Sequence, residues 1–205
     1  MTAAEYLVRY REEFDILFQL LTAANREFNL TRIESRESFD IKHITDSLAL
    51  LEHFPELAER ELKIADVGCG AGFPSLVLGI VCPHWHICSI DSTTKKINFV
   101  RNAAAELGLS RLEAVAGRAC ELNRKKEFQN RFDIITARAV GPAVKLAAET
   151  SRFLKKNGRY IFYKTPHTLE EEIGALQQKF PAVKWKTGER YSLPEDAGSR
   201  IFIYS

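Results

Sequence analysis

The chain has 205 residues, of which 45% are hydrophobic and 27% are charged. This composition is typical of a globular protein and excludes a disordered chain, and the length predicts one domain that folds without a disulfide or metal staple. The net charge is +2, but residues 1–62 hold 7 basic and 13 acidic side chains, against 22 and 14 in residues 63–205. The basic part is a weak indication of a polyanionic partner.

No apolar leader or membrane-spanning segment is expected. The first residues include Glu5 and Arg9, and the uncharged run 67–84 contains four glycines and two prolines, which disfavour a membrane helix. The cysteines form no C-x-x-C pair: they are Cys69, Cys82, Cys88 and Cys120. We therefore expect reduced thiols in a cytoplasmic protein, with no metal site and no contact with a membrane.

Residues 1–62 are predicted to be helical. Apolar residues recur at helical spacing over residues 3–28 and again over residues 38–53, and Pro55 ends the second stretch. We expect this N-terminal helical segment to pack on a main domain formed by residues 63–205.

Residues 63–205 alternate between strands and helices. Strands are predicted at 62–67, 85–90, 112–116, 132–137 and 159–164, followed by two late strands at 183–191 and 200–204. Helices are predicted at 94–107, 140–154 and 168–179. This alternation indicates an α/β fold with a parallel sheet covered on both faces. In such sheets ligands bind at the carboxyl ends of the strands.

Three glycines follow the first strand at alternate positions, Gly68, Gly70 and Gly72. They allow a sharp turn and a close approach of a ligand to the main chain. Asp91 follows the second strand, 19 residues after Gly72, where its carboxylate can accept hydrogen bonds from both hydroxyls of a ribose. Together these features predict a site for an adenosine-containing cofactor, with a chance glycine-rich turn as the alternative.

The type of cofactor follows from the spacing. Dinucleotide sites carry G-x-G-x-x-G, whereas this loop has G-x-G-x-G and places Phe73 where the third glycine belongs. Asp66 ends the first strand, where a carboxylate would crowd a pyrophosphate but suit a cation. Both features favour S-adenosylmethionine over NAD, so an NAD-dependent oxidoreductase is the least favoured class of enzyme.

Six segments occur in the order found in one family: residues 29–31 (N-L-T), 42–47 (K-H-I-T-D-S), 66–74, 91–96 (D-S-T-T-K-K), 117–119 (G-R-A) and 138–140 (R-A-V). With them the chain resembles the bacterial ribosomal RNA small subunit methyltransferase G family, also called glucose-inhibited division protein B. The resemblance implies a class I S-adenosylmethionine-dependent methyltransferase fold. That fold has a Rossmann-like seven-stranded, mostly parallel sheet whose last two strands form an antiparallel hairpin.

The family methylates N7 of one guanosine in small-subunit (16S) ribosomal RNA, and its motifs suggest which residues bind. By resemblance Gly68, Phe73, Ala119, Cys120 and Arg138 contact S-adenosylmethionine, and Asp91 takes the ribose. Many members have an acid where this chain has Cys120, so adenine recognition differs if the family uses that side chain. With the loop, the predicted cofactor-binding set is Asp66, Gly68, Gly70, Gly72, Phe73, Asp91, Ala119, Cys120 and Arg138.

Guanine N7 has an exposed lone pair and carries no proton at neutral pH, so its methylation needs no general base. Catalysis then depends on positioning, for which Arg138, Lys164 and His43 are candidates. A cation that donates to N7 would block the reaction, so guanine should be held at O6, at its other edge or through phosphates. The RNA-binding candidates are His43, Arg118, Arg138, Lys164 and Arg200.

The expected partner is small-subunit ribosomal RNA or the 30S particle, bound by a monomer. The spacing of His43 and Asp46 also predicts a hydrogen bond between them on a helix, with a helix-surface pair or a cap as the alternative. Methylation of another RNA or of a small molecule remains an alternative, as does a non-catalytic module that binds S-adenosylmethionine or RNA.

Overall fold

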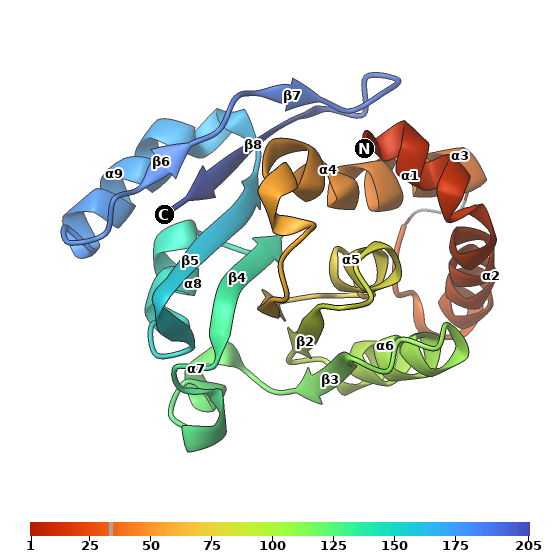
Figure 1. Cartoon of the computed structure of the whole chain (residues 1–205), viewed down its shortest axis with the longest axis horizontal. Helices are drawn as coiled ribbons and strands as arrows, with labels where there is room; N and C mark the ends of the chain where they lie inside the picture. Colours follow the sequence, from red (N-terminus) through yellow and green to blue (C-terminus); the bar gives the residue numbers. More distant parts are fainter. Residues whose placement is uncertain (33–34) are drawn as a thin grey trace.

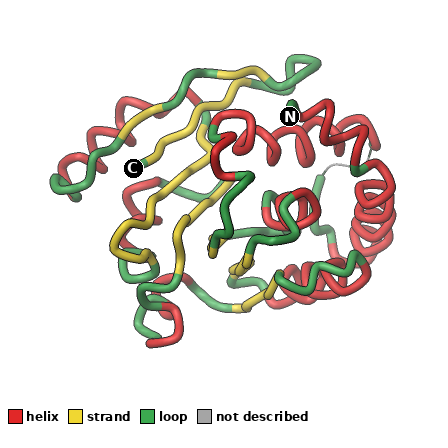
Figure 2. Tube along the Cα trace, viewed as in Figure 1, coloured by secondary structure: helices red, strands yellow, loops and turns green. Residues whose placement is uncertain are grey.

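The computed structural model describes residues 1–32 and 35–205, and its central sheet separates two layers of helices (Figures 1 and 2). The strand order is β3-β2-β1-β4-β5-β8-β6, and β7 pairs with β8 outside this path. The order reverses between β1 and β4, and in parallel sheets ligands bind beside such a reversal.

The first five strands are parallel: β1 (Lys63–Val67), β2 (His86–Asp91), β3 (Leu112–Ala116), β4 (Phe132–Arg138) and β5 (Leu154–Lys164). β8 (Ser199–Tyr204) is antiparallel to β5 and to the short β6 (Lys186–Thr187), and β7 (Tyr191–Ser192) pairs with its start. The expected α/β fold with an antiparallel end is confirmed. The predicted strand 183–191 is wrong in length, because the chain leaves the sheet after Gly188, whose N–H still bonds to Phe202 O.

The helices divide between the two faces of the sheet (Figure 1). One face carries α5 (Ser75–Val81) and α6 (Thr94–Glu106) together with the N-terminal helices α1 (Ala3–Arg9), α2 (Arg11–Phe28), α3 (Arg36–Phe39) and α4 (Asp46–His53). The other carries α7 (Ala119–Leu122), α8 (Ala143–Glu149) and α9 (Leu169–Lys179). Short helical turns η2 (Pro55–Leu57), η3 (Lys126–Phe128) and η4 (Pro166–Thr168) join these elements.

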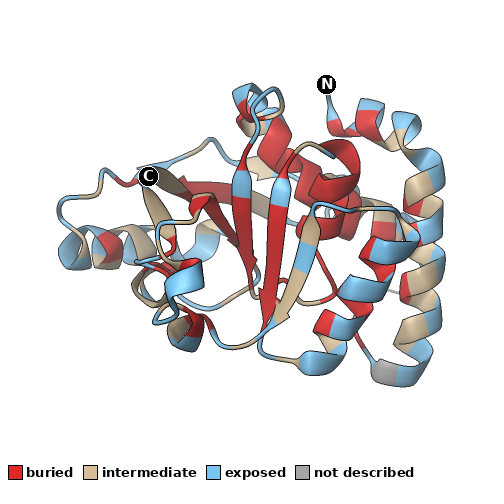
Figure 3. Ribbon diagram, turned by 60° about the horizontal axis from the view of Figure 1, so that its bottom comes forward, coloured by how far each residue is buried: buried red, intermediate tan, exposed pale blue. Residues whose placement is uncertain are grey.

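Strand residues alternate between the two layers with the period of two that a strand dictates. On β1, Ile64 packs in the cluster that contains the N-terminal helices, and Ala65 packs in the cluster below α8. The central strands are almost wholly buried (Figure 3). Residues 1–62 thus share a hydrophobic core with one face of the sheet.

Three predicted helices differ in the structure. The helix expected over 3–28 breaks at Tyr10, whose φ of −111° and ψ of 33° are not helical. The helix expected over 38–53 contains a π-helical segment, η1 (Asp40–Thr45), where Thr45 Oγ1 donates to Asp40 O at 2.9 Å. α8 is shorter than predicted because Pro142 precedes it and Thr150 ends it, donating its hydroxyl to Leu146 O at 2.7 Å.

The start of β5 also differs from the prediction. β5 begins at Leu154, whereas the sequence predicts that the strand begins at residue 159. A bulge lies in the added part, since Leu154 pairs with Phe132 and Arg159 with Ile134. Within the described residues, no helix has the length and apolar character needed to cross a membrane.

Candidate functional site

The glycine loop connects β1 to α5 and exposes its backbone. Gly68, Gly70 and Gly72 have φ values of +73°, +57° and +87°, in the left-handed region that glycine adopts without steric cost. Gly68 N and Cys69 N both donate to Ile90 O, at 2.7 and 3.0 Å. A Cβ on Gly68 would lie 2.4 Å from Val140 Cγ2, so only glycine fits this close approach.

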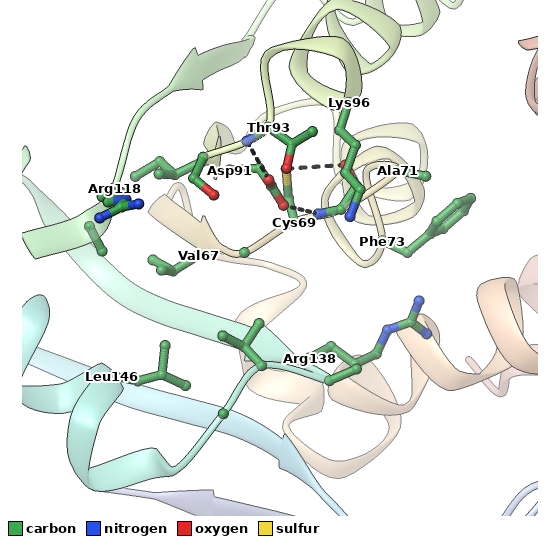
Figure 4. Close-up of a pocket in the computed structure, with 18 of the residues that line it drawn as sticks. Val67, Cys69, Ala71, Phe73, Asp91, Thr93, Lys96, Arg118, Arg138 and Leu146 are labelled. Atoms are coloured by element: carbon green, nitrogen blue, oxygen red, sulfur yellow. Dashed lines mark hydrogen bonds between the residues drawn. The ribbon is translucent and has the colours of Figure 1, made fainter. Parts of the chain in front are cut away.

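A cavity of about 750 Å³ opens at the carboxyl ends of β1, β2 and β4 (Figure 4), within the range typical of small-molecule sites. Its lining brings together seven of the nine residues predicted to bind the cofactor: Gly68, Gly70, Phe73, Asp91, Ala119, Cys120 and Arg138. Arg118 and His43 also line it. These residues come from five segments of the chain, as expected for a site at the carboxyl ends of parallel strands.

Asp91 is held firmly by backbone donors. Its Oδ2 accepts from Gly70 N at 3.0 Å and its Oδ1 accepts from Thr93 N at 2.8 Å (Figure 4). The side chain is almost buried and lines the cavity. Each carboxylate oxygen retains a lone pair, so Asp91 can accept from the hydroxyls of a ribose without turning.

Asp66 and Gly72 do not line the cavity, and the expectation that they contact a ligand there is corrected. Asp66 is fully buried, and its Oδ2 accepts from Ser75 N, at the start of α5, at 3.1 Å. Burial raises the pKa of Asp66 to about 6. Gly72 faces Leu76, whose Cδ1 would lie 2.5 Å from an added Cβ. Both residues therefore contact α5, which follows the glycine loop, and not the cavity.

His43 lies on the cavity wall against Phe73. The two rings stack with centroids 4.0 Å apart and 9° between their planes. His43 Nδ1 faces Arg138 Nη2 at 3.3 Å and Nε2 faces Thr31 Oγ1 at 3.2 Å. Since arginine only donates, Nδ1 is the acceptor and the proton is on Nε2. Burial and the charge of Arg138 lower the pKa of His43 to about 3.

The predicted hydrogen bond between His43 and Asp46 does not form. Arg138 lies between them instead, donating Nη1 to Asp46 Oδ2 at 3.1 Å and to Lys42 O at 2.9 Å. Asp46 Oδ2 also accepts from Arg200 Nε at 3.4 Å. The π-helical segment ends immediately before Asp46, so the spacing of an α-helix does not apply across this stretch.

A second cavity of about 570 Å³ adjoins the first. The two share His43 and residues 138–141, and the second is also lined by Lys42, Asp46, Tyr163, Lys164, Thr165, Glu172 and Arg200. Four of the five RNA-binding candidates therefore line one cavity: His43, Arg138, Lys164 and Arg200. The fifth, Arg118, is exposed at the first cavity.

Lys164 is committed to an ion pair. Its Nζ donates to Gly141 O at 2.8 Å and pairs with Glu172 Oε2 at 2.8 Å, with only 10% of its side chain exposed. Glu172 Oε2 in turn accepts from Ala143 N at 2.6 Å. Lys164 therefore fixes the 139–142 loop to α9, whereas a phosphate contact would require it to break this pair.

Sequence reasoning missed several cavity residues. Lys42 lines the second cavity, is exposed and has no side-chain partner among the described residues. Thr93 and Lys96 line the first cavity (Figure 4). The segments 42–47 and 91–96 carried the family resemblance, and the two lysines in them were the available signal. Leu146 and Glu149 of α8 also line the first cavity, and no motif pointed to them.

The first cavity suits an adenosyl cofactor without phosphate groups. The glycine loop leaves room for a ligand against the main chain, and Asp91 offers acceptors for hydroxyls. Asp91 and Glu149 place two carboxylates in the lining, and carboxylates accept hydrogen bonds from hydroxyls but repel a pyrophosphate. In the part of the chain that is described, no three His, Cys, Asp or Glu side chains are grouped to hold a metal ion.

Comparison with solved structures shows that several methyltransferases have the same fold as this chain. A precorrin-6y C5,15-methyltransferase from Geobacter metallireducens superposes with a TM-score of 0.57 at 13% identity, covering 78% of this chain and 86% of that one. A SAM-dependent methyltransferase from Aquifex aeolicus gives 0.54 at 19% identity, covering 76% and 91%. At these identities the similarity establishes the fold alone.

Sequence comparison is more specific. The family model for rRNA small subunit methyltransferase G matches residues 10–193. The ribosomal RNA small subunit methyltransferase G of Streptococcus sanguinis is 38% identical over 190 residues, covering 91% of this chain and 78% of the relative. That of Streptococcus pyogenes serotype M4 is 40% identical over 199 residues, covering 95% and 81%. The chain belongs to the rRNA small subunit methyltransferase G family.

Proposed function

We propose that the protein transfers the methyl group of S-adenosylmethionine to N7 of a guanosine in small-subunit ribosomal RNA. The observation that carries the proposal is the pair of adjoining cavities at the carboxyl ends of the strands, which share Arg138. One cavity suits the cofactor, and the other opens beside it with a cationic lining. Membership of the family supports the same reaction.

The cofactor, when bound, supplies a methyl group whose bond to sulfur breaks as the bond to N7 forms, leaving a neutral thioether and a cationic guanine. The chain's own residues need not move a proton, because N7 carries none at neutral pH. His43 fits this chemistry: burial and the charge of Arg138 keep its pKa near 3, so the ring stays neutral. The contribution of the protein is then positioning, which can supply roughly 7–11 kcal/mol.

The RNA must present guanine N7 outside a regular helix, since the deep major groove of A-form RNA hides it. Lys42 at the second cavity and Lys96 and Arg118 at the first provide cations for phosphates on either side of an extruded base. We propose that the protein acts as a monomer. We place the reaction in the cytoplasm, with the ribosomal RNA.

The test is methyl transfer from labelled S-adenosylmethionine to small-subunit particles from cells that lack this protein. Borohydride and aniline treatment, which cleaves RNA at N7-methylguanosine, then locates the product. We expect one labelled guanosine in the small-subunit RNA and none in large-subunit RNA, which serves as the control. Label found only in another RNA, in a small molecule or on another atom of guanine would contradict the proposal.

A further inference from the structure

Asp46 holds two guanidinium groups in the second cavity. Its Oδ2 accepts from Arg138 Nη1 at 3.1 Å and from Arg200 Nε at 3.4 Å. The side chains of Asp46, Arg138 and Arg200 are 5%, 11% and 22% exposed. Two cations share one anion in a largely buried place, so the cluster keeps a positive charge that faces the cavity.

The two arginines differ in the donors that remain. Arg138 also donates Nη1 to Lys42 O at 2.9 Å, and its Nη2 faces His43 Nδ1 at 3.3 Å. Arg200 donates Nη1 to Ser199 O at 3.1 Å, and within the described residues its Nη2 has no hydrogen-bond partner. Arginine carries five donor hydrogens in a fixed plane. Arg200 therefore offers an unused donor group, held in orientation by Asp46 and Ser199.

The place of Arg200 relative to the cofactor cavity is also distinctive. Arg138 lines both cavities, whereas Arg200 lines only the second. A guanine whose N7 faces the cofactor cavity presents O6 next to N7, on the same edge of the base. Adenine has an amino group in place of O6, and a guanidinium cannot accept a hydrogen bond from it. A free donor beside the reacting edge therefore favours binding of guanine over adenine.

The other cations of the second cavity fit this role less well. Lys164 Nζ is bound to Gly141 O and Glu172. Lys42 is exposed and lies in the π-helical segment. Its flexible ammonium group is better suited to contact a phosphate than to recognise one base atom.

We propose, on the basis of the proposed function, that the second cavity receives the acceptor guanine and that Arg200 donates a hydrogen bond from Nη2 to its O6. This contact makes Arg200 the residue that selects guanine over adenine. It holds the base at O6 and leaves the lone pair of N7 free to react.

The experiment compares Arg200→Gln with the unaltered protein on three small-subunit RNAs, assembled by ligation after the modified nucleotide has been mapped. The target position carries guanosine, inosine, which keeps O6 but lacks the 2-amino group, or 2-aminopurine riboside, which lacks O6. We expect Arg200→Gln to lower kcat/KM about 30-fold on guanosine and inosine, the range of a hydrogen bond to a charged group, and to leave 2-aminopurine nearly unchanged. Lys42→Gln is the matched control from the same cavity and should lower all three values equally.

Calorimetry with S-adenosylmethionine completes the test, and we expect the affinity of Arg200→Gln to stay within about twofold of the unaltered protein, because Arg200 does not line the first cavity. An equal loss of kcat/KM by Arg200→Gln on all three RNAs would overturn the assignment of Arg200 to O6 and leave the proposed function standing. If the unaltered protein methylates no guanosine RNA, the proposed function fails and the assignment fails with it.

Discussion

The two adjoining cavities are formed by different parts of the chain: the first mainly by backbone groups, the second by charged side chains. The first is formed by the backbone of the glycine loop and by Asp91, whose carboxylate is fixed by the N–H groups of Gly70 and Thr93. The second depends on Asp46 and on arginines that lie 92 and 154 residues further along the chain. Changes in the first should therefore alter ligand binding, whereas changes in the second should alter both stability and methyl transfer.

The largest expected effect is in the second cavity. Asp46→Asn keeps the shape of the side chain but leaves Arg138 and Arg200 without a counter-charge. Breaking a buried ion pair costs about 3–5 kcal/mol, and we expect the free energy of unfolding to fall by about 3 kcal/mol because Arg200 is partly exposed. Urea denaturation followed by circular dichroism measures this change.

Glu61→Gln is the control for the buried pair. Glu61 pairs with Arg111 at 2.7 Å, but 67% of its side chain is exposed, and solvent-exposed ion pairs contribute little to stability. Equal losses in Glu61→Gln and Asp46→Asn would show that burial of the second cavity's charges is not what stabilises it.

The next effect is in the first cavity. Asp91→Asn replaces one carboxylate oxygen by an amide nitrogen, which donates and cannot accept. The side chain then accepts from Gly70 N or from Thr93 N, but not from both. We expect the affinity for S-adenosylmethionine to fall about 30-fold, the range of hydrogen bonds to a charged group, as measured by calorimetry. Glu149→Gln, in the same cavity but paired only loosely with Lys145 at 3.9 Å, should change the affinity less than about twofold. An unchanged affinity in Asp91→Asn would remove Asp91 from the site.

The pH dependence of stability reports on two buried groups: His43, which lines both cavities, and Asp66, which lines neither. The pKa of His43 is lowered from 6.5 to about 3, so its contribution is complete above 6.5 and is lost as the pH falls toward 3. The pKa of Asp66 is raised from 3.8 to about 6, so its contribution is complete below 3.8 and is lost as the pH rises through 6. Between these limits the two effects oppose each other, and the net change is small.

Urea denaturation at pH 7 and about pH 4.5 distinguishes the two groups. His43→Gln should lose less stability on acidification than the unaltered protein, and Asp66→Asn should lose more. Identical pH profiles in all three proteins would show that the pKa values of His43 and Asp66 do not differ between the folded and unfolded states.

The smallest expected effect concerns the exposed rim. Lys42→Gln should weaken binding to small-subunit RNA and reduce the slope of log affinity against log salt by about one, with no loss of thermal stability. Lys156→Gln, in the exposed bulge at the other end of β5, is the control and should leave the slope unchanged. A slope that responds equally to both would mean that RNA contacts the protein diffusely.

The order of strands and helices could be predicted because each depends on local pattern. Apolar runs that end in glycine or aspartate located β1 and β2, and helical spacing indicated the N-terminal helices. The π-helical segment η1 could not be predicted, because its sequence has an ordinary helical pattern and the segment is fixed by packing. The partner of Lys164 was likewise hidden, since Glu172 lies on a different element.

By itself the sequence determined the fold class and indicated most of the predicted cofactor-binding residues that line the first cavity. The glycine spacing and Asp91 act through backbone geometry within one βαβ unit, so they can be recognised without knowing the rest of the molecule. Only the tertiary structure decided which charges are available at the second cavity. Arg138, Arg200 and Lys164 are all basic residues in or near strand ends. Folding pairs Lys164 with Glu172 and holds Arg138 between Asp46 and His43, and among the described residues it leaves one donor group of Arg200 without a partner. A basic residue's role depends on the anion that folding brings beside it, and that anion is distant in the chain.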